Sequence, residues 1–305
     1  MAAATAPALP RLFGVRLALS PIAERRFWSF RGNARGYWAF HVFLVLFVVS
    51  LFAEVIANDR PLLVRYDGAF YTPFLVNYPE TAFGGDFATE AEYRDPFLDE
   101  LIKEKVWMLW PAIAFSYLTI NYALPQPAPS PPSGWLFQES IDSELGPSRL
   151  CANYLGTDDQ GRDVAARALY GFRISVLFGL VLTLVASVVG VAAGAVQGYF
   201  GGWLDLVFQR VIEVWTSLPT LFILIILASI IVPGFWSLLT VMAIFSWPAL
   251  VSEVRAEFVR ARNFDFVRAA RALGVSNGGV MWRHILPNAL VSTLTFLPFI
   301  LSGAV

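Results

Sequence analysis

The chain has 305 residues, of which 57% are hydrophobic and only 15% are charged. An ordinary soluble domain is about 45 to 50% apolar, so this composition is typical of a membrane protein. A formal net charge of −1 supplies no basic surface and argues against a nucleic-acid partner. One cysteine and two histidines fit neither an internal disulfide nor a familiar metal site.

The N-terminal region is basic, with six arginines and one glutamate before the first apolar run. Segments kept in the cytoplasm are enriched in Lys and Arg, so residues 1–37 are predicted to form a cytoplasmic tail. The apolar run 38–56 follows without a small-residue cleavage pattern. We interpret it as a retained first transmembrane helix and not as a removed signal.

Residues 57–173 are predicted to lie on the periplasmic side, because residues 57–150 hold thirteen acidic and six basic residues. The apolar stretch 106–122 is the alternative membrane span in this region. Its insertion would move the later arginine-rich loop outside, so we interpret it as part of a folded external segment. The proline-rich stretch 125–134 predicts an extended surface strap.

The remaining residues, 174–305, read as an all-α membrane core. Four apolar runs approach the length of a membrane span: 174–196, 214–232, 235–251 and 289–305. The first has no charge and thirteen Leu, Ile, Val or Phe residues, which contribute roughly −4 to −8 kcal/mol toward insertion. The loop 253–288 carries six arginines against three acids, which indicates the cytoplasmic side. Because the last run has no polar tail, we expect a further span beyond it.

The loop 253–288 contains the pattern of a short amphipathic helix. Asp265 is predicted to cap it, because its carboxylate can accept hydrogen bonds from the free amides of a first turn. The apolar positions that share one helical face are Phe266, Ala269, Ala270 and Leu273. Gly274 is predicted to end the helix in a left-handed conformation. A compact, alanine-rich face of this kind is suited to docking against another protein.

This loop resembles the EAA loop of ABC importer membrane subunits, in which E-A-A is followed by three residues, G, eleven residues and L-P. The residues at the matching positions are Ala269, Ala270, Gly274, Leu286 and Pro287. Arg268 occupies the position of the family's glutamate. A second stretch, LGTDDQGRDVAARALYG at 155–171, is similar to the segment before the second span of dipeptide and oligopeptide permeases.

Four further stretches, ANDRPLLVRYDGAFYTP, FGGDF, PSPPS and SVLFGLVLTL, are similar to Yej-type permeases of peptide and microcin C import. The resemblance implies a type I ABC importer transmembrane domain in a bacterial inner membrane, with the N-terminus in the cytoplasm. It implies import of peptides, including peptide-nucleotide antibiotics such as microcin C. It also implies three partners: a second permease subunit, a periplasmic peptide-binding protein and an ATPase with two fused nucleotide-binding domains.

The sequence has no GxxxxGK[ST] phosphate loop, so we expect ATP and magnesium to bind the partner ATPase and this chain to be no enzyme. An intramembrane hydrolase is disfavoured because the apolar runs contain no nucleophile motif. The alternative function is a non-transporting membrane scaffold. The arginine-rich loop also has an alternative interpretation, a surface helix paired with anionic lipid.

Two further groups of residues have open interpretations. Small side chains recur at every fourth position, namely Ala186, Gly190, Gly194 and Gly198. This repeat predicts close helix packing, and the alternative is a subunit interface or the translocation path. A polar group precedes the second span and consists of Asp158, Asp159, Arg162 and Asp163. It predicts local caps and ion pairs at an outer mouth, and the alternative is contact with the substrate. Glu213, three residues after Arg210, predicts a helix-surface pair.

Overall fold

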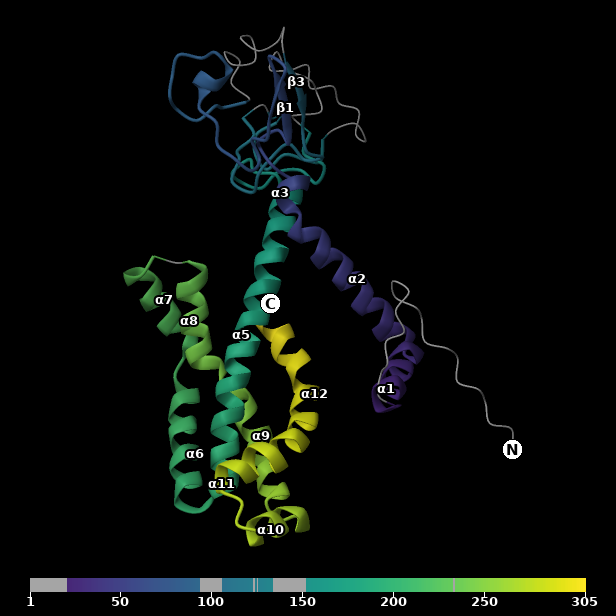
Figure 1. The fold of residues 1–305 in the computed structure, drawn as a ribbon. Helices are drawn as coiled ribbons and strands as arrows, with labels where there is room; N and C mark the ends of the chain where they lie inside the picture. The colour runs from purple at the N-terminus through teal and green to yellow at the C-terminus, as the bar shows by residue number, and fades with distance from the viewer. Residues whose placement is uncertain (1–20, 94–105, 123, 125, 134–151, 233) are drawn as a thin grey trace, which may run out of the picture. The chain divides into compact units, whose positions relative to one another are not determined.

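A computed structural model describes residues 21–93, 106–122, 124, 126–133, 152–232 and 234–305 (Figure 1). The chain divides into two compact units, Met1–Tyr170 and Gly171–Val305. Residues 1–20 of the predicted tail, and residues 125 and 134 of the predicted strap, lie outside the described residues. The described part of the strap, 126–133, contains neither helix nor strand.

The first unit begins with helices α1 (Pro21–Gly32), α2 (Ala34–Leu51) and α3 (Ala53–Ile56). A small antiparallel sheet of order β2-β1-β3 follows, made of β1 (Leu63–Tyr66), β2 (Ala69–Tyr71) and β3 (Val106–Leu109). A short 3-10 helix, η1 (Glu80–Phe83), covers the sheet through Phe83, which is buried with Val64, Ala91 and Tyr93.

The sheet was not part of the predicted all-α fold. Asp67 and Gly68 join β1 to β2 with φ of +47° and +82°, as in a two-residue hairpin turn. Strand β3 pairs with β1 through Val106 to Tyr66 and Leu109 to Leu63. The prediction that 106–122 is not a membrane helix is therefore confirmed, because its first four residues form a strand.

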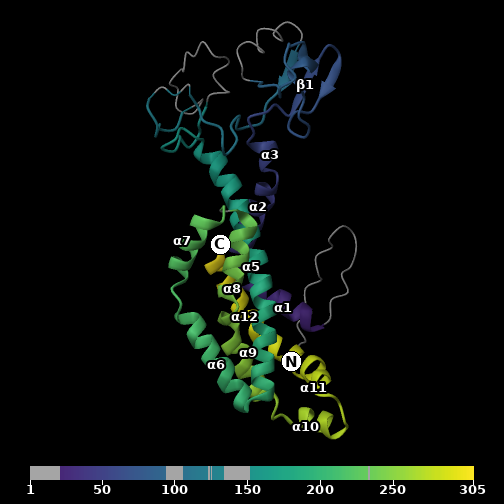
Figure 2. The ribbon, with the colours of Figure 1, turned by 90° about the vertical axis from the view of Figure 1, so that its left-hand side faces the viewer.

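The second unit is helical, and it contains most of α5 (Val164–Phe200), which begins in the first unit. Then come α6 (Gly202–Ser217), α7 (Thr220–Ile230), α8 (Phe235–Ser246) and α9 (Pro248–Ala261). The chain continues through α10 (Asp265–Ala272), α11 (Asn277–Gly279), the π-helical η2 (Val280–Ile285) and α12 (Leu286–Ala304). Figures 1 and 2 show α10 and α11 at the opposite end of this unit from α7.

Four helices of the described chain are long and apolar enough to cross a membrane: Ala34–Leu51, Val164–Phe200, Phe235–Ala261 and Asn277–Ala304. A fifth is possible if α6 and α7, which are bent by 67°, form one broken span. The predicted class of a helical, polytopic membrane protein is thus confirmed.

The predicted spans differ from the observed helices in continuity and length. The run 38–56 is interrupted at Phe52, between α2 and α3, and α5 extends beyond the run 174–196 at both ends. The run 214–232 is not one helix, because Leu218 before Pro219 takes an extended ψ of 129° and a residue preceding proline disfavours helical conformation. The run 235–251 continues as far as Ala261, because Pro248 occupies the first turn of α9, where its missing N–H removes no required hydrogen bond.

Candidate functional site

The segment between α9 and α12, residues 262–285, is the candidate site, and we call it the α9–α12 loop. Its helix α10 begins one residue earlier than predicted. Phe264 is the N-cap, with its carbonyl accepting from the amides of Val267 (3.0 Å) and Arg268 (3.1 Å). Asp265 is the first helical residue and forms no capping bond, so its predicted cap is wrong. Its carboxylate still lies at the helix end where negative charge is favourable.

The predicted apolar face of α10 is split between the interior and the surface. Val267 and Ala270 are buried, at 0% and 6% exposure, in a cluster with Val254 and Phe258 of α9 and with Val280 and Ile285 of η2. Phe266 and Leu273 are 43% and 84% exposed, and Ala269 is exposed beside them. Ala270 therefore does not belong to the free face, because α10 lies against its own chain on that side.

Helix α10 ends as predicted at Gly274, whose φ is +80°. The amide of Val275 donates to the carbonyl of Ala270 (3.1 Å), and the amide of Gly274 donates to that of Arg271 (3.0 Å). This pair of bonds is a Schellman motif, which satisfies carbonyls that the helix end would leave without donors. The exit of the chain from α10 is thereby fixed.

Polar contacts join the α9–α12 loop to the end of α5. The guanidinium of Arg271 lies 4.9 Å from the centroid of the Tyr199 ring, and the Tyr199 hydroxyl donates to Oδ1 of Asn277 (2.8 Å). Nη1 of Arg262 donates to the carbonyls of Gly198 (3.2 Å) and Tyr199 (3.4 Å). Arg268 and Arg271 are both exposed. Tyr199, which is buried, and Arg262, which is partly buried, therefore hold the α9–α12 loop against the end of α5.

Leu286 and Pro287 form the first turn of α12, and Leu286 packs partly buried against the same cluster as Val267. The preceding residues are π-helical. Pro287 has no N–H to donate to the carbonyl four residues earlier, so an ordinary α-helical ladder is interrupted at this point. The L-P pair therefore marks the place where the α9–α12 loop enters a long apolar helix.

A charged pair connects α6 with α9 near the same end of the unit. The guanidinium of Arg255 donates from Nε and Nη2 to both carboxylate oxygens of Asp205, each at 2.6 Å. Two parallel bonds of this kind fix orientation as well as distance. Nε2 of the buried Gln197 in α5 donates to the carbonyl of Asp205 (3.3 Å). Sequence reasoning missed this group, although charges inside otherwise apolar helices were a signal.

The repeat of small residues on α5 lies against α9. A Cβ atom added at Gly190, Gly194 or Gly198 would lie 2.6, 2.8 or 2.5 Å from a backbone carbonyl oxygen. Those oxygens belong to residues spaced four apart, namely Trp247, Val251 and Arg255. Ala186 on the same helix is also buried. This arrangement supports helix packing within the chain over the alternative of a subunit interface or translocation path.

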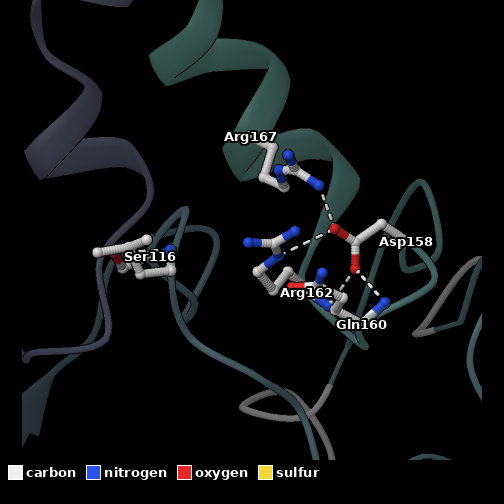
Figure 3. A network of polar contacts seen from close by, with 6 residues as sticks. Ser116, Asp158, Gln160, Arg162 and Arg167 are labelled. Carbon is white, nitrogen blue, oxygen red and sulfur yellow. Dashed lines mark hydrogen bonds and ion pairs between the residues drawn. The ribbon is translucent and has the colours of Figure 1, made fainter. Parts of the chain in front are cut away.

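The polar group in the first unit forms local contacts, and Figure 3 shows those of Asp158 and Arg162. Asp158 accepts from the amides of Gln160 (2.9 Å) and Arg162 (2.8 Å), from Nε of Arg162 (3.0 Å), and from Arg167. Burial alone would raise the pKa of Asp158, but the hydrogen bonds from Arg162 and Gln160 and the charge of Arg162 outweigh it and lower the pKa to about 2. The ion pairs of Asp158 therefore persist until the pH falls well below 4.

The other two acids of that group differ from each other. Asp163 is buried, and its carboxylate accepts from the amide of Ala166 (2.7 Å) and from Nδ2 of Asn153 (2.9 Å), so it caps α5. Asp159 is exposed.

The predicted pair of Arg210 and Glu213 on α6 is confirmed. Among the described residues no group of three or more His, Cys, Asp or Glu could hold a metal ion.

One family model and several known proteins are similar in sequence to this chain. A family model described as "Binding-protein-dependent transport system inner membrane component" matches residues 186–305. The chain is 53% identical over 294 residues to the peptidoglycan transport system permease protein YejE of Agrobacterium fabrum, covering 94% of this chain and 77% of that relative. It is 54% identical over 287 residues to the inner membrane ABC transporter permease protein YejE of Escherichia coli, covering 94% and 79%. The dipeptide transport system permease protein DppC of Alkalihalophilus pseudofirmus is 34% identical over 164 residues, covering 52% and 53%.

Proposed function

Because the chain belongs to the family of ABC-transporter inner-membrane permeases, we propose that it is the permease subunit of an ATP-driven importer of peptides. The name of the Agrobacterium relative includes peptidoglycan transport, and that of the DppC relative includes dipeptide transport. The chemistry common to both is a short peptide. We include peptide fragments of the cell wall and peptide-nucleotide antibiotics such as microcin C among the proposed substrates.

The observation that carries the proposal is the two-sided character of α10. One side, Val267 and Ala270, is fixed inside the chain, while Phe266, Ala269 and Leu273 remain exposed on the other. An exposed apolar strip on a short, rigidly ended helix suits binding to a second protein. We propose that this strip docks on a separate ATPase with two fused nucleotide-binding domains, in a complex that includes a second permease subunit and a periplasmic binding protein.

The same contacts suggest how binding of the ATPase to α10 would be transmitted to the membrane-spanning helices. The α9–α12 loop is fastened to α5 through Tyr199 and Arg262, and α9 is fastened to α6 through Asp205 and Arg255. A displacement of α10 by the ATPase would therefore move these helix ends together. Coupling in this scheme needs no catalytic group in this chain, and we assign it none.

Reconstitution of the complex tests the function. In proteoliposomes containing both permease subunits and the ATPase, peptide-loaded binding protein should stimulate ATP hydrolysis and drive labelled peptide into the lumen on the ATPase side. A dipeptide and a peptide bearing cell-wall sugars, tested separately, would identify the substrate class. Unchanged hydrolysis and no uptake with any loaded binding protein would instead favour a scaffold.

The proposed orientation predicts a difference in chemical labelling between two exposed alanines, Ala88 in the first unit and Ala272 at the end of α10. In a Cys151→Ser background, without the ATPase, Ala88→Cys should react with a membrane-impermeant thiol reagent in cells with a permeable outer membrane. Ala272→Cys should react only after the inner membrane is opened. The opposite pattern would reverse the topology and remove the docking assignment.

A further inference from the structure

Helices α1 and α2 meet at a closed turn around Asn33. The amide of Asn33 donates to the carbonyl of Phe30 (3.1 Å), and its Oδ1 accepts from the amide of Gly36 (3.3 Å). Helix α2 is long and apolar enough to span a membrane, whereas α1 has 12 residues and is too short. The turn therefore marks a boundary between a membrane helix and a helix outside the apolar layer.

Positive charge is concentrated on both sides of this turn. Between residues 21 and 36, Glu24 is the single acidic residue, and four arginines are exposed: Arg25, Arg26, Arg31 and Arg35. None of these arginines forms an ion pair with another described residue. The guanidinium of Arg31 instead lies 5.3 Å from the centroid of the Trp28 ring. The surface thus presents cationic groups that the described part of the chain does not neutralise.

Aromatic side chains surround the same turn. The Phe30 ring packs on Tyr37 and Phe40, with centroid separations of 5.8 Å in both cases, so that α1 and the first turns of α2 are in contact. Trp38 is 66% exposed beside them. Aromatic rings are enriched at the level of lipid headgroups, where an apolar body and a polar edge are both satisfied.

We propose that this collar binds anionic lipid headgroups where α2 enters the membrane; it comprises Arg25, Arg26, Trp28, Phe30, Arg31, Arg35 and Trp38. The guanidinium group matches a phosphate with two parallel hydrogen bonds, and each arginine near an anionic surface contributes about 1 kcal/mol. The collar is continuous with a membrane helix, which places its charges beside headgroups and not beside a soluble ligand. The proposal is independent of the transported substrate and of the direction of transport.

Lipid-specific quenching tests the collar in the complete chain reconstituted in nanodiscs. A fluorophore on Ser29→Cys, in a Cys151→Ser background, reports from the exposed surface of α1. Nitroxide-labelled phosphatidylglycerol and nitroxide-labelled phosphatidylcholine are compared at equal mole fraction. We expect the anionic lipid to quench at least about fivefold more effectively, the ratio that corresponds to about 1 kcal/mol, and 0.5 M salt to reduce the difference.

Two sets of substitutions at the same four positions distinguish an effect of charge from an effect on folding. Replacing all four arginines by glutamine should make the two lipids equally effective quenchers, whereas replacing all four by lysine should keep most of the preference. Equal quenching in the unsubstituted chain would overturn the proposal. So would a label shielded from both lipids, because that result would show that protein and not lipid covers α1.

Discussion

Replacing Leu273 by aspartate should reduce binding-protein-stimulated ATP hydrolysis and peptide uptake at least about tenfold, while the chain still inserts and accumulates normally. Leu273 is 84% exposed and contacts no core, so the free chain loses little. Docking would bury it, and burial of a leucine contributes about 1.5 to 3 kcal/mol. A carboxylate there must also be desolvated. A loss of only 1.4 kcal/mol already corresponds to about tenfold. The assay is proteoliposome transport with the amount of chain quantified.

Four further variants make the result specific to α10. Leu273→Met keeps an apolar side chain of similar volume and should transport nearly normally. Leu75→Asp changes a leucine that is 71% exposed in the first unit, and coupling should be unaffected. Ala269→Leu should impair coupling at normal abundance, whereas Ala270→Leu should lower abundance because its site is buried. Normal transport by Leu273→Asp would show that α10 does not dock.

Replacing Gly198 by alanine should destabilise the helical unit by about 1 to 3 kcal/mol, although only one methyl group is added. The new Cβ would lie 2.5 Å from the carbonyl oxygen of Arg255 and 2.7 Å from Cβ of Phe258. Backbone atoms cannot rotate away, so α9 must shift, and the pair of Arg255 with Asp205 would be strained by that shift. Thermal unfolding of the purified protein and its yield from membranes measure the effect.

Gly171→Ala is the matched control on the same helix. A Cβ at Gly171 meets nothing within 4 Å, so alanine should be neutral or slightly stabilising through its higher helix propensity. Gly194→Leu should be worse than Gly198→Ala, since a larger side chain enters a contact of 2.8 Å with the carbonyl of Val251. If Gly198→Ala unfolds at the same temperature as Gly171→Ala, α5 and α9 are not in close contact in the membrane.

Local patterns in the sequence were sufficient for several features. The four-residue spacing of small side chains on α5 is a property of one helix, and it was visible without knowledge of the partner helix. The positive φ of Gly274 follows from its place after a short apolar helix. The membrane-spanning runs were predicted from hydropathy alone, and hydropathy carries no information about the direction of the backbone. For that reason the same method missed the bend at Leu218, where the backbone turns but the side chains remain apolar.

Features that depend on contacts between distant residues were not predictable in this way. Asp205 and Arg255 are fifty positions apart in the chain, and only the packing of α6 against α9 brings them together. Helical spacing placed Ala270 with Ala269, but it gave no information about where α9 would lie. The sheet was missed because β1 and β3 have only four residues each and are separated by a long connection. The Asp67-Gly68 turn could have revealed its first hairpin.

The contact between α5 and α9 also has a consequence at the level of the gene. Every single-base change that alters a glycine codon to another amino acid gives a larger side chain, and at Gly190, Gly194 and Gly198 even the first added carbon meets a backbone oxygen. No small step away from glycine is therefore available at these three codons. We expect purifying selection to keep glycine at these three positions, while position 171 on the same helix accepts other residues.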